Sequence, residues 1–423
     1  MLLYDAGIWL YRQGIRIASK TRNVKARQLN AGLNGVWDKL RSEADAGGGY
    51  VWIHAASLGE FEQGRPLMEK IRREHPDKKI LLTFFSPSGY EVRKNYGGAD
   101  VIVYMPQDTR RNVRKFLDIV RPEMAIFVKY EFWLNYLAEL KRRDIPTYLI
   151  SGIFRKDQAF FRSYGGYYRK ALRCFTKLYL QDEGSRRLLE GIGIRNSAVT
   201  GDTRFDRVSD IMRGVRPLPL LDRFCATAEE RRADRECSHR ALIFMAGSSW
   251  PADEAVYGEW LRESEGVKGV IAPHEFDEER LRKMIEFFGN KAVLLSDATK
   301  NPSLLNDAKV LIIDCFGLLS SAYTYADIAY VGGGFGAGLH NINEAAVYGV
   351  PVIYGPNNAK FIEAQEMKTL GGGIEVTDKE SFGNAIDLLT RDAGHRLEKG
   401  EKSAAYIRGK LGATDKIYAE LFR

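Results

Sequence analysis

The chain has 423 residues, of which 45% are hydrophobic and 28% charged, so it is not a largely disordered protein and has room for two domains of ordinary size. Its formal net charge of +8 favours negatively charged partners, namely nucleic acids, anionic membranes or acidic small molecules. The four cysteines and six histidines show no metal-ligand spacing. We therefore expect reduced thiols in a cytosolic protein and no structural metal.

Residues 1–45 are expected to form a helical segment that associates with a membrane. Apolar side chains recur at helical spacing at Tyr4, Ile8, Tyr11, Ile15 and Ala18, and Trp9 and Leu10 widen this side. A basic block follows, made of Arg12, Arg16, Lys20, Arg22, Lys25 and Arg27. This pattern is typical of a helix lying on an anionic membrane, but it also suits a helix that packs on the protein's own core. The longest uncharged run, 6–11, is too short to span a bilayer or to be a secretory signal.

Residues 46–205 alternate between short apolar runs and helical patterns. The apolar runs, which are typical of buried parallel strands, lie at 51–55, 79–85, 101–105, 124–129, 147–151, 178–181 and 197–200. Helical patterns between them include 61–73, 109–120, 132–143 and 183–192. This alternation predicts a doubly wound α/β domain.

Residues 206–240 interrupt the alternation with Pro217, Pro219 and many charges, and are expected to be a linker with a helical piece. A second α/β domain is expected over 241–400. Its strands are predicted at 241–246, 267–272, 292–295, 309–313, 328–331, 350–354 and 374–376, with helices at 252–263, 277–288, 317–325 and 359–369. Residues 401–423 are expected to form a final helix that packs back on the first domain. Two such domains place a ligand cleft at the carboxyl ends of their strands.

In the first domain, carboxylates stand at two junctions between a strand and a helix. The first strand leads to Ser57, Gly59 and Glu60, where a carboxylate at a helix N-terminus stays ionised and can remove a proton from a sugar hydroxyl. A plain first-turn acid is the alternative. Glu131 holds the equivalent position after the strand at 124–129. Arg204 is a plausible anion ligand, although an exposed arginine is equally ordinary.

In the second domain, the most informative stretch is 331–356. Five glycines, at 332, 333, 334, 336 and 338, allow a backbone to approach a ligand closely. Asn341 or Asn343 can cap a helix that carries Glu344, whose N-terminus suits a phosphate and whose carboxylate suits a ribose. Other loops after strands supply Ser248, Ser249, Pro273, His274, Phe316, Gly317 and Leu318. Together they indicate nucleotide binding, and the absence of GxxxxGK[ST] argues against a P-loop NTPase.

This set of loops resembles the Kdo transferases, which attach 3-deoxy-D-manno-octulosonic acid (Kdo) to lipid A precursors. The resemblance covers nearly the whole chain and rests on the segments 57–60, 131–135, 204–206, 246–249, 272–274 and 331–356. The sequence departs from the family pattern at Lys129, where an acid is common, and at Leu134, where a proline is usual.

The resemblance implies a GT-B fold, with two Rossmann-like domains facing a central cleft. It implies an inverting, metal-independent and cofactor-independent transfer of Kdo from CMP-Kdo to lipid IVA in lipopolysaccharide core biosynthesis. The enzyme would lie at the cytoplasmic face of the bacterial inner membrane, peripheral or N-terminally anchored. Glu60 would be the general base, Glu131 a second carboxylate near the acceptor, and Ser57 and Gly59 acceptor-binding residues. The implied donor-binding residues are Arg204, Ser248, Ser249, Pro273, His274, Phe316, Gly317, Leu318, Asn341 and Glu344.

Two other interpretations remain open at this point. One is a different GT-B sugar-nucleotide enzyme, such as a nucleotide-diphosphate-sugar transferase or a non-hydrolysing epimerase. The other is a non-catalytic, membrane-surface nucleotide-binding protein. Nucleic-acid binding is not expected, because the sequence contains no RRM, zinc or helix-turn-helix signal.

Overall fold

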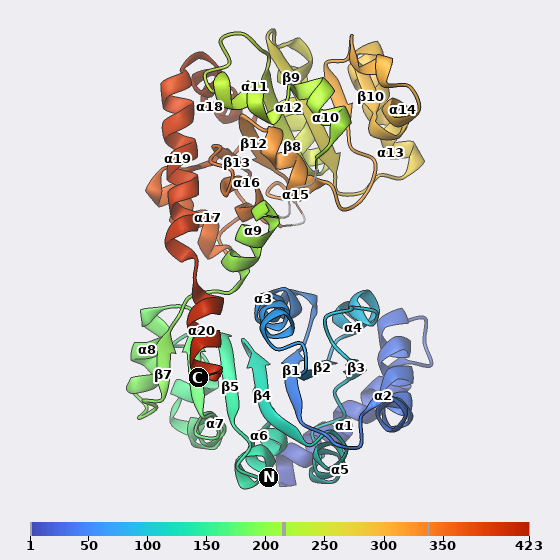
Figure 1. Cartoon of the computed structure of the whole chain (residues 1–423), viewed down its shortest axis with the longest axis vertical. Coiled ribbons are helices and arrows are strands. Elements are labelled where there is room, and N and C mark those ends of the chain that lie inside the picture. Colours follow the sequence, from blue (N-terminus) through green and yellow to red (C-terminus); the bar gives the residue numbers. More distant parts are fainter. Residues whose placement is uncertain (1, 214–216, 337, 423) are drawn as a thin grey trace. The chain divides into compact units, whose positions relative to one another are not determined.

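The computed structural model describes residues 2–213, 217–336 and 338–422, and its chain forms two compact units (Figure 1). The first unit contains Met1–Arg207 and Leu411–Arg423, and the second contains Val208–Lys410. Each unit is built on a seven-stranded sheet in which all neighbouring strands are parallel. All fourteen predicted strands are present, which confirms the predicted α/β class.

The sheet of the first unit has the strand order β3-β2-β1-β4-β5-β6-β7. Its strands are β1 (Tyr50–Ala55), β2 (Lys79–Phe84), β3 (Val101–Tyr104), β4 (Pro122–Val128), β5 (Thr147–Gly152), β6 (Lys177–Leu180) and β7 (Ser197–Val199). Its helices are α1 (Leu2–Ala18), α2 (Val24–Glu43), α3 (Leu58–Glu74), α4 (Pro87–Arg93), α5 (Arg110–Val120), α6 (Leu134–Arg142), α7 (Gly166–Leu172), α8 (Glu183–Glu190) and α20 (Ala413–Leu421).

Both faces of this sheet are covered, which is why its strands are apolar without a polar alternation. On one face, the Trp52 ring packs against Phe116 of α5 and Tyr136 of α6, with ring centroids 4.9 and 5.4 Å apart. On the other face, Ile53 packs in a cluster with Phe61 of α3 and other buried apolar side chains. Successive strand residues point to opposite faces, so one short strand serves both layers.

The apolar stripe predicted for the N-terminal helix lies largely against the protein. Tyr4 packs on the sheet cluster and Ile15 is buried beside Leu29 and Tyr104. The exposed apolar side chains of α1 are Tyr11, which belongs to the predicted stripe, Trp9 and Leu10, which were expected to widen it, and Ile17. Within the described residues, no helix is long and apolar enough to cross a membrane.

The sheet of the second unit has the order β10-β11-β9-β8-β12-β13-β14. Its strands are β8 (Leu242–Ser249), β9 (Val267–Pro273), β10 (Ala292–Leu294), β11 (Val310–Ile312), β12 (Ile328–Val331), β13 (Val352–Tyr354) and β14 (Gly373–Glu375). The helices around it are α10 (Pro219–Cys225), α11 (Ala228–Ala233), α12 (Pro251–Glu263), α13 (Glu278–Phe288), α14 (Leu295–Lys300), α15 (Leu319–Ala322), α16 (Asn343–Ala346), α17 (Ile362–Leu370), α18 (Lys379–Arg391) and α19 (Ala393–Lys410).

The structure divides two predicted segments differently. The expected linker over 206–240 is mostly helical, with α9 (Arg204–Arg213) followed by α10 and α11, and from Val208 onward it belongs to the second unit. Residues 214–216 of that linker lie outside the described residues. The single helix expected over 401–423 is two helices, because α19 ends at Lys410 and α20 starts at Ala413.

The break between α19 and α20 has a local cause at Gly412. This residue has φ of 95°, a left-handed conformation that glycine adopts without the strain of a side chain. The Asp206 carboxylate accepts hydrogen bonds from the backbone N–H groups of Gly412 and Thr414, each at 2.6 Å. These bonds satisfy donors at the start of α20 and hold that helix on the first unit.

Candidate active site

In each sheet, the strand order changes direction between two central strands, and the carboxyl ends of these strands carry predicted site residues. In the first unit the change lies between β1 and β4, which are followed by the loops of Glu60 and Glu131. In the second unit it lies between β8, whose carboxyl end holds Ser248, and β12, which is followed by the glycine loop. Ligands of doubly wound folds bind at such points, because the loops diverge there and leave a crevice.

Glu60 is a half-buried carboxylate in the first turn of α3. The Ser57 hydroxyl donates a hydrogen bond to its Oε2 atom instead of capping the helix backbone. Within the described part of the chain, Oε1 of Glu60 has no hydrogen-bond partner. It lies at the positive end of the helix dipole, where a negative charge interacts favourably with the helix N–H groups. The arrangement therefore presents an oriented carboxylate with one unused acceptor.

Glu131 lies deeper than predicted for a residue that meets a ligand. Its side chain is buried, accepts a hydrogen bond of 2.5 Å from Nε1 of Trp133, and lies 3.1 Å from Nε2 of His54. Nδ1 of His54 lies 2.8 Å from the Thr83 hydroxyl, so His54 is a buried histidine of the core with partners at both ring nitrogens. Because its Oε2 atom already serves two partners, Glu131 is placed to orient Trp133 and His54.

Arg204 is held at the edge of this site by a buried carboxylate. Its Nε atom donates to Oδ2 of Asp202 at 2.9 Å, and its backbone N–H donates to Oδ1 at 2.9 Å. Asp202 also accepts from Nε2 of Gln63 at 3.1 Å. Gln63 follows Glu60 by almost one turn of α3. Asp202 therefore links Arg204 to the helix that carries Glu60.

Tyr130 lies near several charged residues of this site. Burial raises the pKa of its hydroxyl, the charges of Arg155 and Arg204 lower that pKa, and the charges of Glu60 and Asp202 raise it. The sequence analysis did not select Tyr130 or Arg155, although Tyr130 directly precedes Glu131.

In the second unit, a buried carboxylate that sequence reasoning missed holds the glycine loop. Asp253 of α12 is fully buried and accepts hydrogen bonds from the N–H groups of Gly333 at 2.8 Å and Trp250 at 2.9 Å. It also accepts from the Tyr330 hydroxyl at 3.0 Å. A Cβ atom on Gly332 would stand 2.3 Å from the Ser248 carbonyl oxygen, so only glycine fits there. Pro251 followed by Asp253 at the third helix position is the sequence signal for this cap.

Three rings stack beside the glycine loop. The Trp250 and His274 rings have centroids 4.6 Å apart at 25°, and the His274 and His340 rings are 4.5 Å apart at 29°. Nε1 of Trp250 donates to Nε2 of His340 at 3.1 Å. Burial, and secondarily the charge of His274, lowers the pKa of His340. His340 therefore serves as a neutral acceptor, and it too was missed from the sequence.

The loops after β9 and β11 bring two more aromatic side chains together. The rings of Phe276 and Phe316 have centroids 4.5 Å apart, and Phe316 is 83% exposed. Gly317 follows with φ of 88°, which turns the chain toward Leu318 and the four-residue helix α15. The predicted donor residues Phe316 and Gly317 are therefore accessible, whereas α15 is too short to present a full helix N-terminus.

The structure places three predicted donor-binding features differently from what the sequence pattern indicates. The Ser249 side chain is fully buried and lies 2.7 Å from the Tyr257 hydroxyl, and Pro273 is buried at the end of β9. The helix that carries Glu344 is α16, which has only four residues, and neither Asn341 nor Asn343 is its N-cap. The Asn341 side chain instead accepts from the N–H of Asn343 at 3.2 Å and donates to Glu344 at 3.0 Å. Ala337 of the glycine loop lies outside the described residues.

The remaining predicted residues keep their expected places. His274 is exposed after β9, and Ser248 is half-buried with φ of 51° near the carboxyl end of β8. Gly59 is exposed beside Glu60. Over residues 2–213, 217–336 and 338–422, no group of three histidine, cysteine or acidic side chains could hold a metal ion.

Comparison with known protein sequences shows which proteins this chain resembles. Residues 20–207 match the model described as 3-deoxy-D-manno-octulosonic-acid transferase (kdotransferase). The chain is 27% identical over 376 residues to the 3-deoxy-D-manno-octulosonic acid transferase of Chlamydia muridarum, with 86% of this chain and 82% of that protein covered. It is 25% identical over 348 residues to the Aquifex aeolicus transferase of the same name, with 81% and 85% covered. The chain is therefore similar to the Kdo transferases over most of its length.

Solved structures similar to this chain show the fold. A UDP-GlcNAc 2-epimerase from Neisseria meningitidis aligns with a TM-score of 0.58 at 14% identity, covering 88% of this chain and 99% of that one. MurG of Acinetobacter baumannii aligns with a TM-score of 0.53 at 10% identity, covering 88% and 98%. These likenesses confirm a GT-B fold of two Rossmann-like domains.

Proposed function

We propose that this protein is a glycosyltransferase of the Kdo transferase type, which moves Kdo from CMP-Kdo to a lipid A precursor, lipid IVA, in lipopolysaccharide core biosynthesis. The observation that carries the proposal is the Glu60 carboxylate, oriented by Ser57 at the direction change of the first sheet, with one oxygen unused among the described residues. A base for glycosyl transfer needs this combination of an ionised form, a fixed direction and an accessible lone pair.

The reaction we propose is a single displacement with inversion. Glu60 takes the proton of a glucosamine hydroxyl of the lipid, and the oxygen attacks the anomeric carbon of Kdo. The bond from that carbon to the CMP phosphate oxygen breaks, so CMP leaves from the opposite face through a transition state with oxocarbenium character. Glu131 supports the step indirectly, because it fixes Trp133 and His54 beside the Glu60 loop.

The second unit supplies features that suit the donor. The stacked rings of Trp250, His274 and His340 give a flat polar surface, and His274 is exposed. The glycine loop, held by Asp253, allows the backbone to approach a phosphate closely. Glu344, oriented by Asn341, suits a ribose diol. We assign CMP-Kdo to these groups together with Ser248, Phe316 and Gly317.

Helix α1 supports a location at the cytoplasmic face of the inner membrane. Trp9 is 59% exposed, Leu10 62% and Ile17 68%, and exposed basic residues follow at Arg16, Lys20, Arg22, Lys25 and Arg27. Such a surface suits an anionic lipid interface. Tyr11 of α1 stacks on Phe85 at 5.9 Å, and Phe85 packs on Trp133 at 4.9 Å. Aromatic contacts therefore run from this helix to the loop of Glu131.

The test is a transfer assay with purified protein, CMP-Kdo and a tetraacylated lipid A precursor, read by the mass increment of the lipid. Replacing Glu60→Gln keeps the shape of the side chain but removes the base, so we expect turnover to fall about 10²-fold or more. Glu62→Gln is the matched control, because Glu62 lies on the same helix and pairs with Arg93 at 2.8 Å. Near-normal turnover of folded Glu60→Gln would remove Glu60 as the base.

Donor identity is tested separately by equilibrium binding of CMP and UDP. We expect CMP to bind more tightly than UDP, because a donor with a single phosphate needs fewer positive charges than a diphosphate donor. Tighter binding of UDP would favour a nucleotide-diphosphate-sugar enzyme instead.

A further inference from the structure

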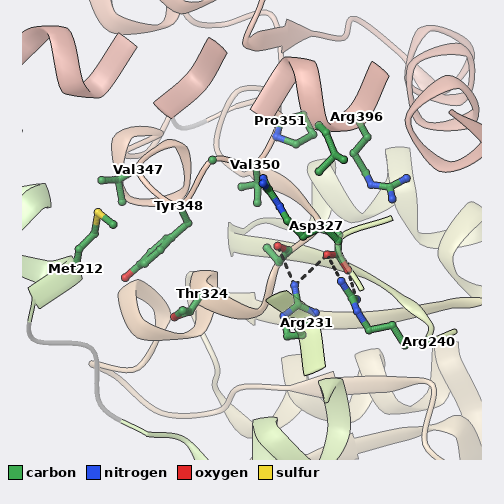
Figure 2. Close-up of a pocket in the computed structure, with 14 residues that line it drawn as sticks. Met212, Arg231, Arg240, Thr324, Asp327, Val347, Tyr348, Val350, Pro351 and Arg396 are labelled. Carbon is green, nitrogen blue, oxygen red and sulfur yellow. Dashed lines mark hydrogen bonds and ion pairs between the residues drawn. The ribbon is translucent and has the colours of Figure 1, made fainter. Parts of the chain in front are cut away.

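A polar cavity lies at the amino ends of the strands in the second unit, away from the glycine loop. Its volume is about 290 Å³, and it is lined by residues that precede β8, β12 and β13, such as Arg240, Asp327 and Pro351 (Figure 2). The glycine loop follows the carboxyl end of β12. In a parallel sheet these are opposite edges, so the cavity is separate from the candidate donor site.

The lining of this cavity carries an excess of positive charge. It contains the guanidinium groups of Arg231, Arg235, Arg240 and Arg396, and among the described residues that line it Asp327 is the one acidic side chain. Figure 2 shows Arg231 and Arg240 directed at Asp327. Arg240 binds both of its oxygens at 2.7 and 2.8 Å, and Arg231 binds Oδ1 at 3.0 Å. One carboxylate thus faces two guanidinium groups.

Two of these arginines are buried. Arg231 is 9% exposed, and its Nη1 atom has no hydrogen-bond partner among the described residues. Arg396 is 2% exposed and donates to the carbonyl oxygens of Leu389 at 2.8 Å and Glu236 at 2.9 Å and to Sγ of Cys237 at 3.6 Å, but to no carboxylate of the described chain. The Leu389 carbonyl lies in the last turn of α18, whose negative end offsets only part of the charge. Burying a cation costs free energy unless an anion accompanies it.

Arg235 adds a charge that the fold itself does not use. Arg235 lines the cavity. Its side chain is exposed and has no hydrogen-bond or ion-pair partner over the described ranges. The opposite wall is less polar and includes Met212, Tyr348 and Val350 (Figure 2). A ligand with an anionic head and a small organic body would match both walls.

We propose that this cavity binds a phosphorylated small molecule, whose phosphate meets the guanidinium groups of Arg231, Arg235 and Arg396. Guanidinium groups bind phosphate oxygens in a forked geometry and stay charged at any physiological pH. The site goes beyond the transfer reaction, since it uses none of the residues assigned to donor, acceptor or base.

The first experiment titrates the full-length protein with inorganic pyrophosphate by calorimetry, at constant ionic strength and with CMP already saturating. CMP binding is measured beforehand. A proposed donor site that fails to bind CMP is thereby distinguished from a cavity that fails to bind pyrophosphate. We expect one saturable pyrophosphate site. Arg235→Gln should weaken its affinity at least tenfold, because a charge-assisted contact is lost while no internal contact changes. Met212→Glu, which places a like charge at the exposed Met212 position, should weaken it similarly.

The matched control is Arg195→Gln, which removes an exposed arginine from the first unit and should leave the affinity unchanged. Absence of saturable binding, or equal weakening by Arg195→Gln and Arg235→Gln, would overturn the proposal.

A competition experiment then separates two sources of the phosphate. Displacement of pyrophosphate by phosphatidic acid vesicles, and not by phosphatidylcholine vesicles, assigns the site to a lipid head group. No displacement by either assigns it to a soluble phosphate compound.

Discussion

At the scale of single residues, Asp253 is the side chain on which the glycine loop depends. It lies 80 positions before Gly333 in the sequence, yet its carboxylate binds that backbone N–H directly. Burial raises the pKa of Asp253, and the three donors around it lower that pKa. The hydrogen bonds thus offset the cost of placing a charge in the core.

We expect Asp253→Asn to destabilise the second unit by about 1–3 kcal/mol, because an amide N–H₂ would face a backbone N–H and leave a buried donor unpaired. The measurement is denaturant unfolding, together with CMP affinity, which should also fall. Asp297→Asn is a suitable control, since Asp297 is half-exposed and pairs only with Lys300 at 3.2 Å. Equal stability of both variants would show that Asp253 does not hold the loop.

His340 makes the second unit sensitive to acid. Its pKa is lowered in the folded protein, and the ordinary value for an unfolded histidine is about 6.5. The folded state therefore binds the proton less readily than the unfolded state. The contribution of neutral His340 to the free energy of unfolding is fully present above pH about 6.5 and is lost as the pH falls through the lowered pKa.

We expect His340→Gln to unfold with a weaker dependence on pH below about 6.5, because glutamine can accept from Trp250 without titrating. Free energies of unfolding measured across this range for both proteins test the point. Parallel curves for the wild type and the variant would contradict it.

At the scale of elements, α1 has two different sides. Its inner side is fixed by the Tyr4 hydroxyl, which donates to Asp108 at 2.6 Å, and by Asp5, which accepts from Asn135 at 2.9 Å. Its outer side exposes Trp9, Leu10 and Ile17. A helix held in this way presents its apolar side chains to a membrane without having to unfold from the domain.

Replacing Trp9, Leu10 and Ile17 together by serine should reduce binding to anionic vesicles at least tenfold, since each exposed apolar side chain contributes burial in the lipid interface. The assay is vesicle co-sedimentation. The control replaces three exposed leucines elsewhere, Leu304, Leu370 and Leu388, by serine. If both triple variants bind vesicles as the wild type does, α1 is not the membrane contact.

At the scale of the whole molecule, the chain passes between the two units twice. It leaves the first unit after Arg207 and returns at Leu411, so α20 completes a domain that began some 400 positions earlier. Ile417 of α20 is fully buried in the cluster under α3, and Lys70 of α3 binds Asp415 at 2.7 Å. The first unit therefore depends on the last residues of the sequence.

Calorimetric unfolding should resolve this dependence. Ile417→Ala leaves a cavity and should lower the stability of the first unit by about 2–5 kcal/mol, while the transition of the second unit stays in place. Leu388→Ala, at an exposed position of α18, should shift neither transition. A shift of the second-unit transition alone by Ile417→Ala would contradict the docking of α20.

The sequence by itself determined the strands and the loops that follow them. Buried parallel strands are continuous apolar runs, and their carboxyl ends had to carry the polar and glycine-rich junctions. Glu60, His274 and the glycine loop were therefore found from local pattern alone. The helix boundary at Lys410 was missed, because the helical pattern continues across Gly412 and only the contact with Asp206 marks the new start.

The tertiary structure decided which face of each element is covered and which distant groups meet. Periodicity shows that Tyr4 and Ile15 share a side of a helix, but not whether lipid or protein covers that side. It cannot show that Asp253 binds Gly333, that His340 completes a ring stack, or that four arginines enclose one cavity, since these partners lie far apart in sequence. Such contacts depend on long-range packing of whole elements, which no local pattern of residues encodes.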